Sequence, residues 1–159
     1  MRCYDFDSGL EKTITIMKEE IINGIKYRLD EENLTAEVIR KGEYIDCIII
    51  PEAVVFNDLT YRVTSIGKYA FHDCKKLSSI TIPESVEIIG DSAFAYCESL
   101  KVIAIPNSVK YIGDWAFSSC SSLAVITFQG AAPWMKGIGL GDNWHFGSPA
   151  KITIVPTEL

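Results

Sequence analysis

Hydrophobic residues recur between residues 66 and 128 with a constant spacing of 23 residues. Each copy has the same apolar letters in the same order, so a fixed period rather than a single amphipathic pattern organises the chain. The recurring columns are Ile66, Ile89 and Ile112, each followed by glycine, then Ala70-Phe71, Ala93-Phe94 and Ala116-Phe117, then Cys74, Cys97 and Cys120, then Leu77, Leu100 and Leu123, and then Ile80, Ile103 and Ile126.

Each copy contains one segment with strand periodicity and one with helical spacing. Leu77-Ser-Ser-Ile-Thr-Ile ends in the alternation typical of a strand, and Pro83 ends that strand. Ala93, Phe94 and Cys97 have helical spacing, which predicts a helix of about two turns at most. The glycine before it provides either a positive φ or a close approach to a neighbouring copy.

A unit this small cannot bury its apolar face alone, so the copies must stack. We therefore expect an α/β solenoid with a parallel sheet on one face and short helices or turns on the other. The repeated phenylalanines and cysteines would lie inside it.

The repeat resembles the BspA-like class of leucine-rich repeats of bacterial surface proteins. The pattern IGxxAFxxCxxLxxIxIPxSV is present as "IGKYAFHDCKKLSSITIPESV" from Ile66 and as "IGDSAFAYCESLKVIAIPNSV" from Ile89. The resemblance implies a right-handed solenoid, a secreted or cell-surface location and adhesion to host molecules as a role. No signal peptide is recognisable at the start of this chain, so a cytoplasmic location stays open.

These patterns divide the chain into three parts. Residues 1–43 are predicted to form an N-terminal β cap, with a hairpin at Asn23-Gly24. Residues 44–130 carry the repeats and an inserted hairpin at 54–63. Residues 131–159 are predicted to form a C-terminal capping loop and a final strand, "KITIV".

The C-terminal part is expected to cover the open end of the solenoid. Its aromatic residues Trp134, Trp144 and Phe146 would fold back over the last coil. The closely spaced glycines of "GIGLGD" could suggest a phosphate-binding loop. Such a loop follows a strand and is followed by a helix. That context is missing, so a flexible cap loop is the better interpretation.

Composition and charge exclude several classes of function. The 159 residues are 48% hydrophobic and 23% charged, as expected of one folded domain, and the net charge is −6 without a basic run. A nucleic-acid partner is therefore not expected. No apolar run approaches the length of about 20 residues that a membrane-spanning helix needs.

Candidate chemistry is sparse. The chain has five cysteines but no CxxC pair, and three of them are spaced by the repeat period, which favours reduced packing thiols over a metal site. His72 occupies the slot of Ala95 and Ser118 in the sister copies and is interpreted as a solvated surface residue. His72 and Cys74 are two residues apart and do not face each other on a helix. We expect no catalytic residue, metal or cofactor.

The remaining hypothesis is a non-enzymatic binding module for a protein or glycan, present as a monomer or weak homo-oligomer. A structural spacer or self-assembling scaffold is the alternative. The predicted contact residues lie on the outer face of the sheet and on the opposite wall, and which of the two binds stays open. They are Ser79, Thr81, Val102, Ala104, Val125 and Thr127 on the sheet, and Tyr69 and His72 on the wall.

Overall fold

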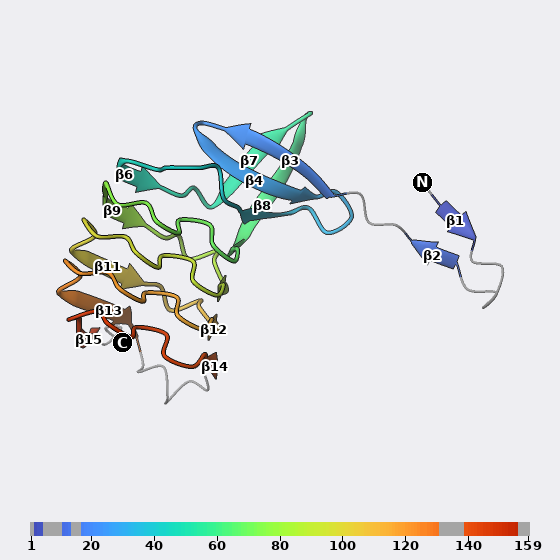
Figure 1. Cartoon of the computed structure of the whole chain (residues 1–159). Helices are drawn as coiled ribbons and strands as arrows, with labels where there is room; N and C mark the ends of the chain where they lie inside the picture. Colours follow the sequence, from blue (N-terminus) through green and yellow to red (C-terminus); the bar gives the residue numbers. More distant parts are fainter. Residues whose placement is uncertain (1, 5–10, 14–16, 131–138, 156–159) are drawn as a thin grey trace.

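A computed structural model describes residues 2–4, 11–13, 17–130 and 139–155. It shows an N-terminal group of strands followed by about four stacked coils (Figure 1). A separate antiparallel pair is formed by β1 (Arg2–Tyr4) and β2 (Glu11–Thr13).

The N-terminal group is built mainly from hairpins. β3 (Met17–Ile22) pairs antiparallel with β4 (Ile25–Asp30), and β4 with β5 (Thr35–Val38). A second hairpin joins β7 (Ala53–Phe56) to β8 (Leu59–Ile66), and β8 lies parallel to β5.

Both hairpins turn through residues in the left-handed conformation. Asn23 and Gly24 have φ of 49° and 82°, and Asn57 and Asp58 have φ of 48° and 61°. Asn, Asp and Gly tolerate this conformation best, so the sequence specifies both turns. The hairpins predicted at these positions are present, while the division of the chain into three parts stays a prediction.

Each coil contributes strands to two parallel ladders. The first ladder runs from the end of β8 through β10 (Ile88–Ile89) and β12 (Tyr111–Ile112) to β14 (Gly139–Leu140). This ladder was not predicted from the sequence, because two-residue strands leave no periodic signal.

The second ladder is the predicted parallel sheet, and it consists of two parts. β6 (Asp46–Ile49) pairs with β9 (Leu77–Thr81), and β11 (Val102–Ile105) pairs with β13 (Val125–Gln129), which pairs with β15 (Lys151–Val155). β9 and β11 lie side by side without forming a strand pair. The final strand predicted at "KITIV" is β15.

The short helices predicted for the opposite wall are not present, since the described residues contain no helix. Each such segment is a series of turns in which alternate N–H groups donate to the next coil. The N–H groups of Tyr69, Phe71 and Asp73 donate to the carbonyls of residues 91, 93 and 95, at 2.7 to 3.0 Å. The N–H groups between them donate three residues back. This pattern uses the donors that an α-helix would need, which is why helical spacing did not produce a helix.

The core is a stack of equivalent side chains. The rings of Phe71, Phe94 and Phe117 are parallel within 2°, with centroids 5.2 Å apart. Tyr44 extends the stack at one end, and Trp144 closes it at the other at 6.1 Å from Phe117. All three repeated phenylalanines are fully buried, so the predicted interior ladder is confirmed.

The repeated cysteines form a second buried ladder. The thiols of Cys97 and Cys120 each donate to the carbonyl of a phenylalanine in the preceding coil, Phe71 and Phe94, at 3.1 Å. Cys74 is equally buried, and none of these three cysteines is bridged. Burial raises the pKa of the Cys120 thiol to about 11 and that of Cys97 further, so both stay protonated near neutral pH.

The recurring glycine is explained by close approach. A Cβ at Gly90 would lie 2.7 Å from the backbone nitrogen of Lys68 in the preceding coil, closer than van der Waals contact allows. Gly67, Gly113 and Gly141 face similar obstruction, and none of these four glycines has a positive φ. Adjacent coils are therefore in contact at backbone level along this column.

The C-terminal segment is a further coil with a longer spacing. Leu140-Gly141 pairs with the coil of Ile112-Gly113, 28 residues earlier, so the interpretation of "GIGLGD" as a flexible loop is wrong for its described residues. Trp144 is buried and lies against Phe117 and Phe128, as predicted. Phe146 contacts Trp115 but stays 60% exposed, and Trp134 lies outside the described residues.

Candidate binding surfaces

The outer face of the sheet presents the small, uncharged side chains expected from the sequence. Ser79, Thr81, Val102 and Ala104 are exposed, and Val125 and Thr127 are half-buried. The strand register places Val102 beside Val125 and Ala104 beside Thr127, as the columns predict. This face carries no aromatic side chain at these positions, and it is divided where β9 and β11 fail to pair.

The turn wall carries exposed aromatic side chains instead. Its aromatic row comprises Tyr69, His72, Tyr96, Trp115 and Phe146. Tyr69, Tyr96 and Trp115 are each between 41% and 47% exposed. Trp115 and Phe146 meet edge to face at 5.5 Å. The row therefore runs along several coils on the wall opposite the sheet.

Three members of the aromatic row have left-handed backbone. The φ angles of Tyr69, Tyr96 and Trp115 are 60°, 62° and 59°. For a residue with a Cβ this conformation costs about 1 to 2 kcal/mol, and only Gly, Asn and Asp adopt it readily. The equivalent positions in sister coils carry Asp73, Ser92 and Ser119, all small and polar. Aromatic residues are therefore unfavourable choices for the local fold.

His72 is less exposed than the sequence indicated. It is half-buried, and the equivalent Ala95 and Ser118 are buried, so the interpretation of this slot as a solvated surface is wrong. The His72 ring lies between Tyr69 and Tyr96, at 5.4 Å from each. Its Nδ1 is buried without a hydrogen-bond partner among the described residues. His72 thus joins two coils of the aromatic row.

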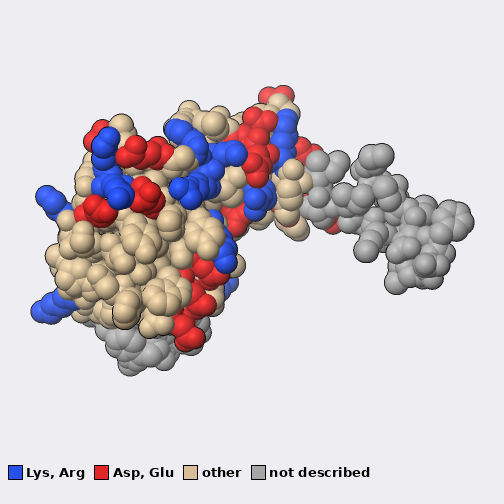
Figure 2. Space-filling model, in the orientation of Figure 1, with Lys and Arg blue, Asp and Glu red and all other residues tan. Residues whose placement is uncertain are grey.

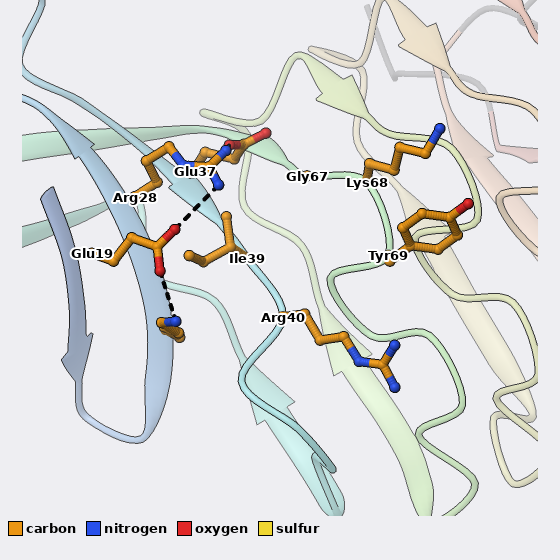
Figure 3. Close-up of a pocket in the computed structure, with 9 residues that line it drawn as sticks. Glu19, Arg28, Glu37, Ile39, Arg40, Gly67, Lys68 and Tyr69 are labelled. Carbon is orange, nitrogen blue, oxygen red and sulfur yellow. Dashed lines mark hydrogen bonds and ion pairs between the residues drawn. The ribbon is translucent and has the colours of Figure 1, made fainter. Parts of the chain in front are cut away.

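A polar pocket of about 360 Å³ lies where the N-terminal strands meet the first coil (Figure 3). Lys26, Arg28 and Glu37 line its N-terminal side, and Lys68 and Tyr69 line its other side. The walls are completed by Glu19, Ile39, Arg40 and Gly67. Figure 3 shows Arg40 between the two sides.

Ion pairs organise the N-terminal side of the pocket. Glu19 contacts Lys26 at 2.7 Å and Arg28 at 3.2 Å, and the other arm of Arg28 contacts Glu37 at 2.9 Å. Hydrogen bonds from Lys26 and Arg28 lower the pKa of Glu19. Both carboxylates are therefore already paired with cations.

Charges on the rest of the surface follow the coils. In the view of Figure 2, Lys and Arg gather where the N-terminal strands meet the first coil, and acidic side chains follow the edge near β12 and β14. A broad area over the coils carries neither. Several ion pairs join residues one period apart, such as Lys68 with Asp91 and Lys110 with Glu87.

Other site types have no support among the described residues. No group of three or more His, Cys, Asp or Glu side chains in that part of the chain is arranged to hold a metal ion. No helix there is long and apolar enough to cross a membrane.

The pocket was not predicted from the sequence. Its walls come from β3, β4 and β5, from the two residues that follow β5, and from the first turn segment. No motif links these positions. The one available signal was the alternation of β4, where Lys26 and Arg28 share the face opposite Tyr27 and Leu29.

The stacked coils, parallel ladders and interior phenylalanine column define a leucine-rich repeat solenoid. Residues 39–136 match the family described as BspA type Leucine rich repeat region, in six copies, and the chain belongs to this family. A search of the curated proteins finds no match.

Solved structures agree with this assignment. A leucine-rich repeat protein from Bacteroides ovatus is 31% identical with a TM-score of 0.69, over 85% of this chain and 37% of that one. One from Bacteroides capillosus is 28% identical with the same TM-score, over 86% of this chain and 98% of that one. A leucine rich cell surface protein from Faecalibacterium prausnitzii, 23% identical with a TM-score of 0.58, shares the fold over 87% of this chain and 43% of that one.

Proposed function

We propose that this protein is a non-enzymatic binding module that recognises a protein partner at or outside a bacterial cell surface. The contact surface would be the aromatic row. Membership of the BspA-type family supports a repeat scaffold used for binding. The similarity to a leucine rich cell surface protein supports the location.

The observation that carries the proposal is the placement of exposed aromatic side chains on left-handed backbone. Asp73, Ser92 and Ser119 of the sister coils have the same left-handed conformation, so the repeat requires this backbone, and Asp would adopt it more readily than Tyr at the position of Tyr96. Strained, exposed residues of this kind are concentrated at functional sites. Tyr and Trp are also enriched among the few residues that carry most of the binding energy in protein interfaces.

The test separates binding from stability with substitutions to asparagine. Tyr96→Asn and Trp115→Asn should leave the free energy of unfolding unchanged or raise it by up to about 1 kcal/mol, because Asn tolerates a left-handed φ. The same variants should weaken binding by at least about tenfold, as expected of interface anchors. Unfolding is followed by chemical denaturation, and binding by surface plasmon resonance against a panel of purified extracellular proteins.

The matched control is Tyr111→Asn. Tyr111 is 40% exposed but lies on β12, outside the aromatic row and without a positive φ. It should leave binding unchanged. Equal losses in Tyr111→Asn, or losses confined to Val102→Asn on the sheet, would contradict the assignment to the aromatic row. Light scattering that rises with concentration would favour the self-assembling scaffold.

A further inference from the structure

A column of mostly acidic side chains lies beside the aromatic row. It consists of the residues that follow the recurring glycines, one in each coil: Lys68, Asp91, Asp114 and Asp142. Tyr69 and Trp115 of the aromatic row come directly after Lys68 and Asp114 in the chain. Figure 2 shows acidic side chains near β12 and β14 at the border of the broad uncharged area over the coils. The later coils of the aromatic row therefore have an acidic border.

Hydrogen bonds between coils hold these carboxylates in place. Oδ1 of Asp91 accepts the N–H of Asp114 at 3.1 Å, and Oδ1 of Asp114 accepts the N–H of Asp142 at 2.6 Å. Oδ2 of Asp91 contacts the ammonium of Lys68 at 3.2 Å. The carboxylates of Asp114 and Asp142, in contrast, have no cation within 4.0 Å in the part of the chain that the structure describes.

Lys68 shows how a cation is held at this border. Its ammonium contacts Asp91 of the next coil and lies over the ring of Tyr69, at 5.2 Å from the centroid. The N–H of Tyr69 donates to the carbonyl of Asp91 at 3.0 Å, so the backbone keeps the ring and the carboxylate together. A cation between a carboxylate and an aromatic ring is stabilised by both.

The same backbone arrangement recurs two coils further on without its cation. The N–H of Trp115 donates to the carbonyl of Asp142 at 3.2 Å, as that of Tyr69 does to Asp91. The residue before Trp115 is Asp114, so a carboxylate stands where the first coil supplies the ammonium. Trp115 is 41% exposed, and Asp142 is exposed as well. Two carboxylates and a tryptophan therefore border a place where the first coil holds a cation of its own.

We propose that the partner of the aromatic row is a basic protein segment that places an arginine against Trp115, between Asp114 and Asp142. This inference rests on the proposed function and names the chemistry of the partner. A guanidinium can bind a carboxylate through two hydrogen bonds and can also stack on an aromatic ring. The acidic border complements a basic segment in charge, which favours this partner over neutral or acidic ones.

Titration of the full chain with two peptides tests this chemistry. One peptide alternates glycine and arginine, and in the other citrulline replaces each arginine, because citrulline has nearly the same shape but no charge. The backbone amide signals of Asp114, Trp115 and Asp142 should report a dissociation constant at least about tenfold lower for the arginine peptide, as expected of a charge-assisted contact. Equal constants for the two peptides, or no response of these amides to the arginine peptide, would overturn the proposal.

Substitution of one carboxylate assigns the effect to this place. Asp142→Asn should weaken binding of the arginine peptide by at least about tenfold. Asp58→Asn is the matched control, because Asp58 is exposed in the turn between β7 and β8 and Asn tolerates its φ of 61°. It causes the same change in net charge and should leave binding unchanged. Equal losses in the two variants would overturn the site, since net charge alone would then explain the binding.

Removal of the chain's own cation tests the equivalence of the two places. Lys68→Gln frees Oδ2 of Asp91 and the ring of Tyr69. The arginine peptide should therefore gain a second binding place in this variant, seen as new peptide-dependent shifts of the Tyr69 and Asp91 amides. Amides that stay as unresponsive as in the natural chain would contradict the comparison on which the proposal rests.

Proteins bound in the panel described above separate this inference from the proposed function. A partner weakened by both Trp115→Asn and Asp142→Asn supports both. A partner weakened by Trp115→Asn but not by Asp142→Asn would overturn the basic segment and leave the aromatic row as the contact surface. Panel binding that is unchanged in Trp115→Asn would overturn the proposed function, whereas the peptide titration still decides whether an arginine binds beside Trp115.

Discussion

The N-terminal strands and the coils differ in which residues become partners. β3 pairs with β4, and β4 with β5, so these partners are adjacent in the chain and tight turns set their register. In the coils, β11 pairs with β13 one full period away, and the identity of the side chains in each column sets the register. A change in a hairpin therefore acts locally, whereas a change in a column affects the coils on both sides.

The largest expected effect is the loss of a ring from the middle of the phenylalanine stack. Phe94→Ala should lower the free energy of unfolding by about 3 to 5 kcal/mol, because both flanking rings, Phe71 and Phe117, lose their partner. Chemical denaturation measures the loss. Hydrogen exchange should show lower protection in the two adjacent coils than in the β3–β4 hairpin.

Tyr111→Ala is the control for this substitution. Its side chain lies on the outside of the coils, so its loss should cost at most about 1 kcal/mol. A loss below about 1 kcal/mol for Phe94→Ala would contradict the view that the stack holds the coils together.

The same substitution at two glycines sharpens the comparison. Gly90→Ala should cost about 3 kcal/mol, because the new Cβ would collide with the backbone of the preceding coil. Gly24→Ala meets no atom within 4 Å and should cost only about 1 kcal/mol, the strain of a φ of 82°. Thermal unfolding of the two variants compares the costs. The reverse order would show that the hairpin, not the contact between coils, is the tighter constraint.

Alkaline pH should affect the coils before the N-terminal strands. Burial raises the pKa of the Cys120 thiol from 9.0 to about 11. The folded protein therefore keeps this proton at pH values where the unfolded chain has lost it. The contribution of Cys120 to the free energy of unfolding is fully present below pH 9 and is lost as the pH rises through 11. The free energy of unfolding should fall by about 2 kcal/mol between pH 8 and 11 from this group. Burial also raises the pKa of Tyr27 in β4 from 10.0. The contribution of this N-terminal residue to the free energy of unfolding therefore declines only above pH 10.

Denaturation at pH 8, 9, 10 and 11 of the natural chain and of Cys120→Ala isolates the thiol. The variant lacks this group, and its stability should decline less steeply between pH 9 and 11. Parallel curves for the two proteins would show that Cys120 does not titrate as its burial requires.

The interior of the coils could be predicted from the sequence because each buried column is repeated. Three copies of Phe and Cys at a constant spacing cannot be explained by one amphipathic helix. The wall opposite the sheet was mispredicted because the spacing of Ala93, Phe94 and Cys97 records which side chains point inward. It does not show whether the backbone N–H groups donate hydrogen bonds within the segment or to the next coil.

The geometry of the candidate surfaces was predicted less well. Tyr69 and His72 were identified because they break the repeat pattern. The left-handed φ of Tyr69 and the contact of His72 with Tyr96 in the next coil depend on backbone geometry that the sequence does not reveal. The pocket joins residues from a hairpin and a coil that have no common period. Leu140-Gly141 was missed because five additional residues separate it from the preceding copy.

The Asn23-Gly24 turn has a consequence for the order of folding. It closes the β3–β4 hairpin through two residues, whereas each coil must close a loop of about 23 residues before its first bond to a neighbour forms. Short loops cost less entropy and close faster than long ones. We therefore expect the N-terminal hairpin to form early and to serve as a nucleus onto which the coils are added one after another.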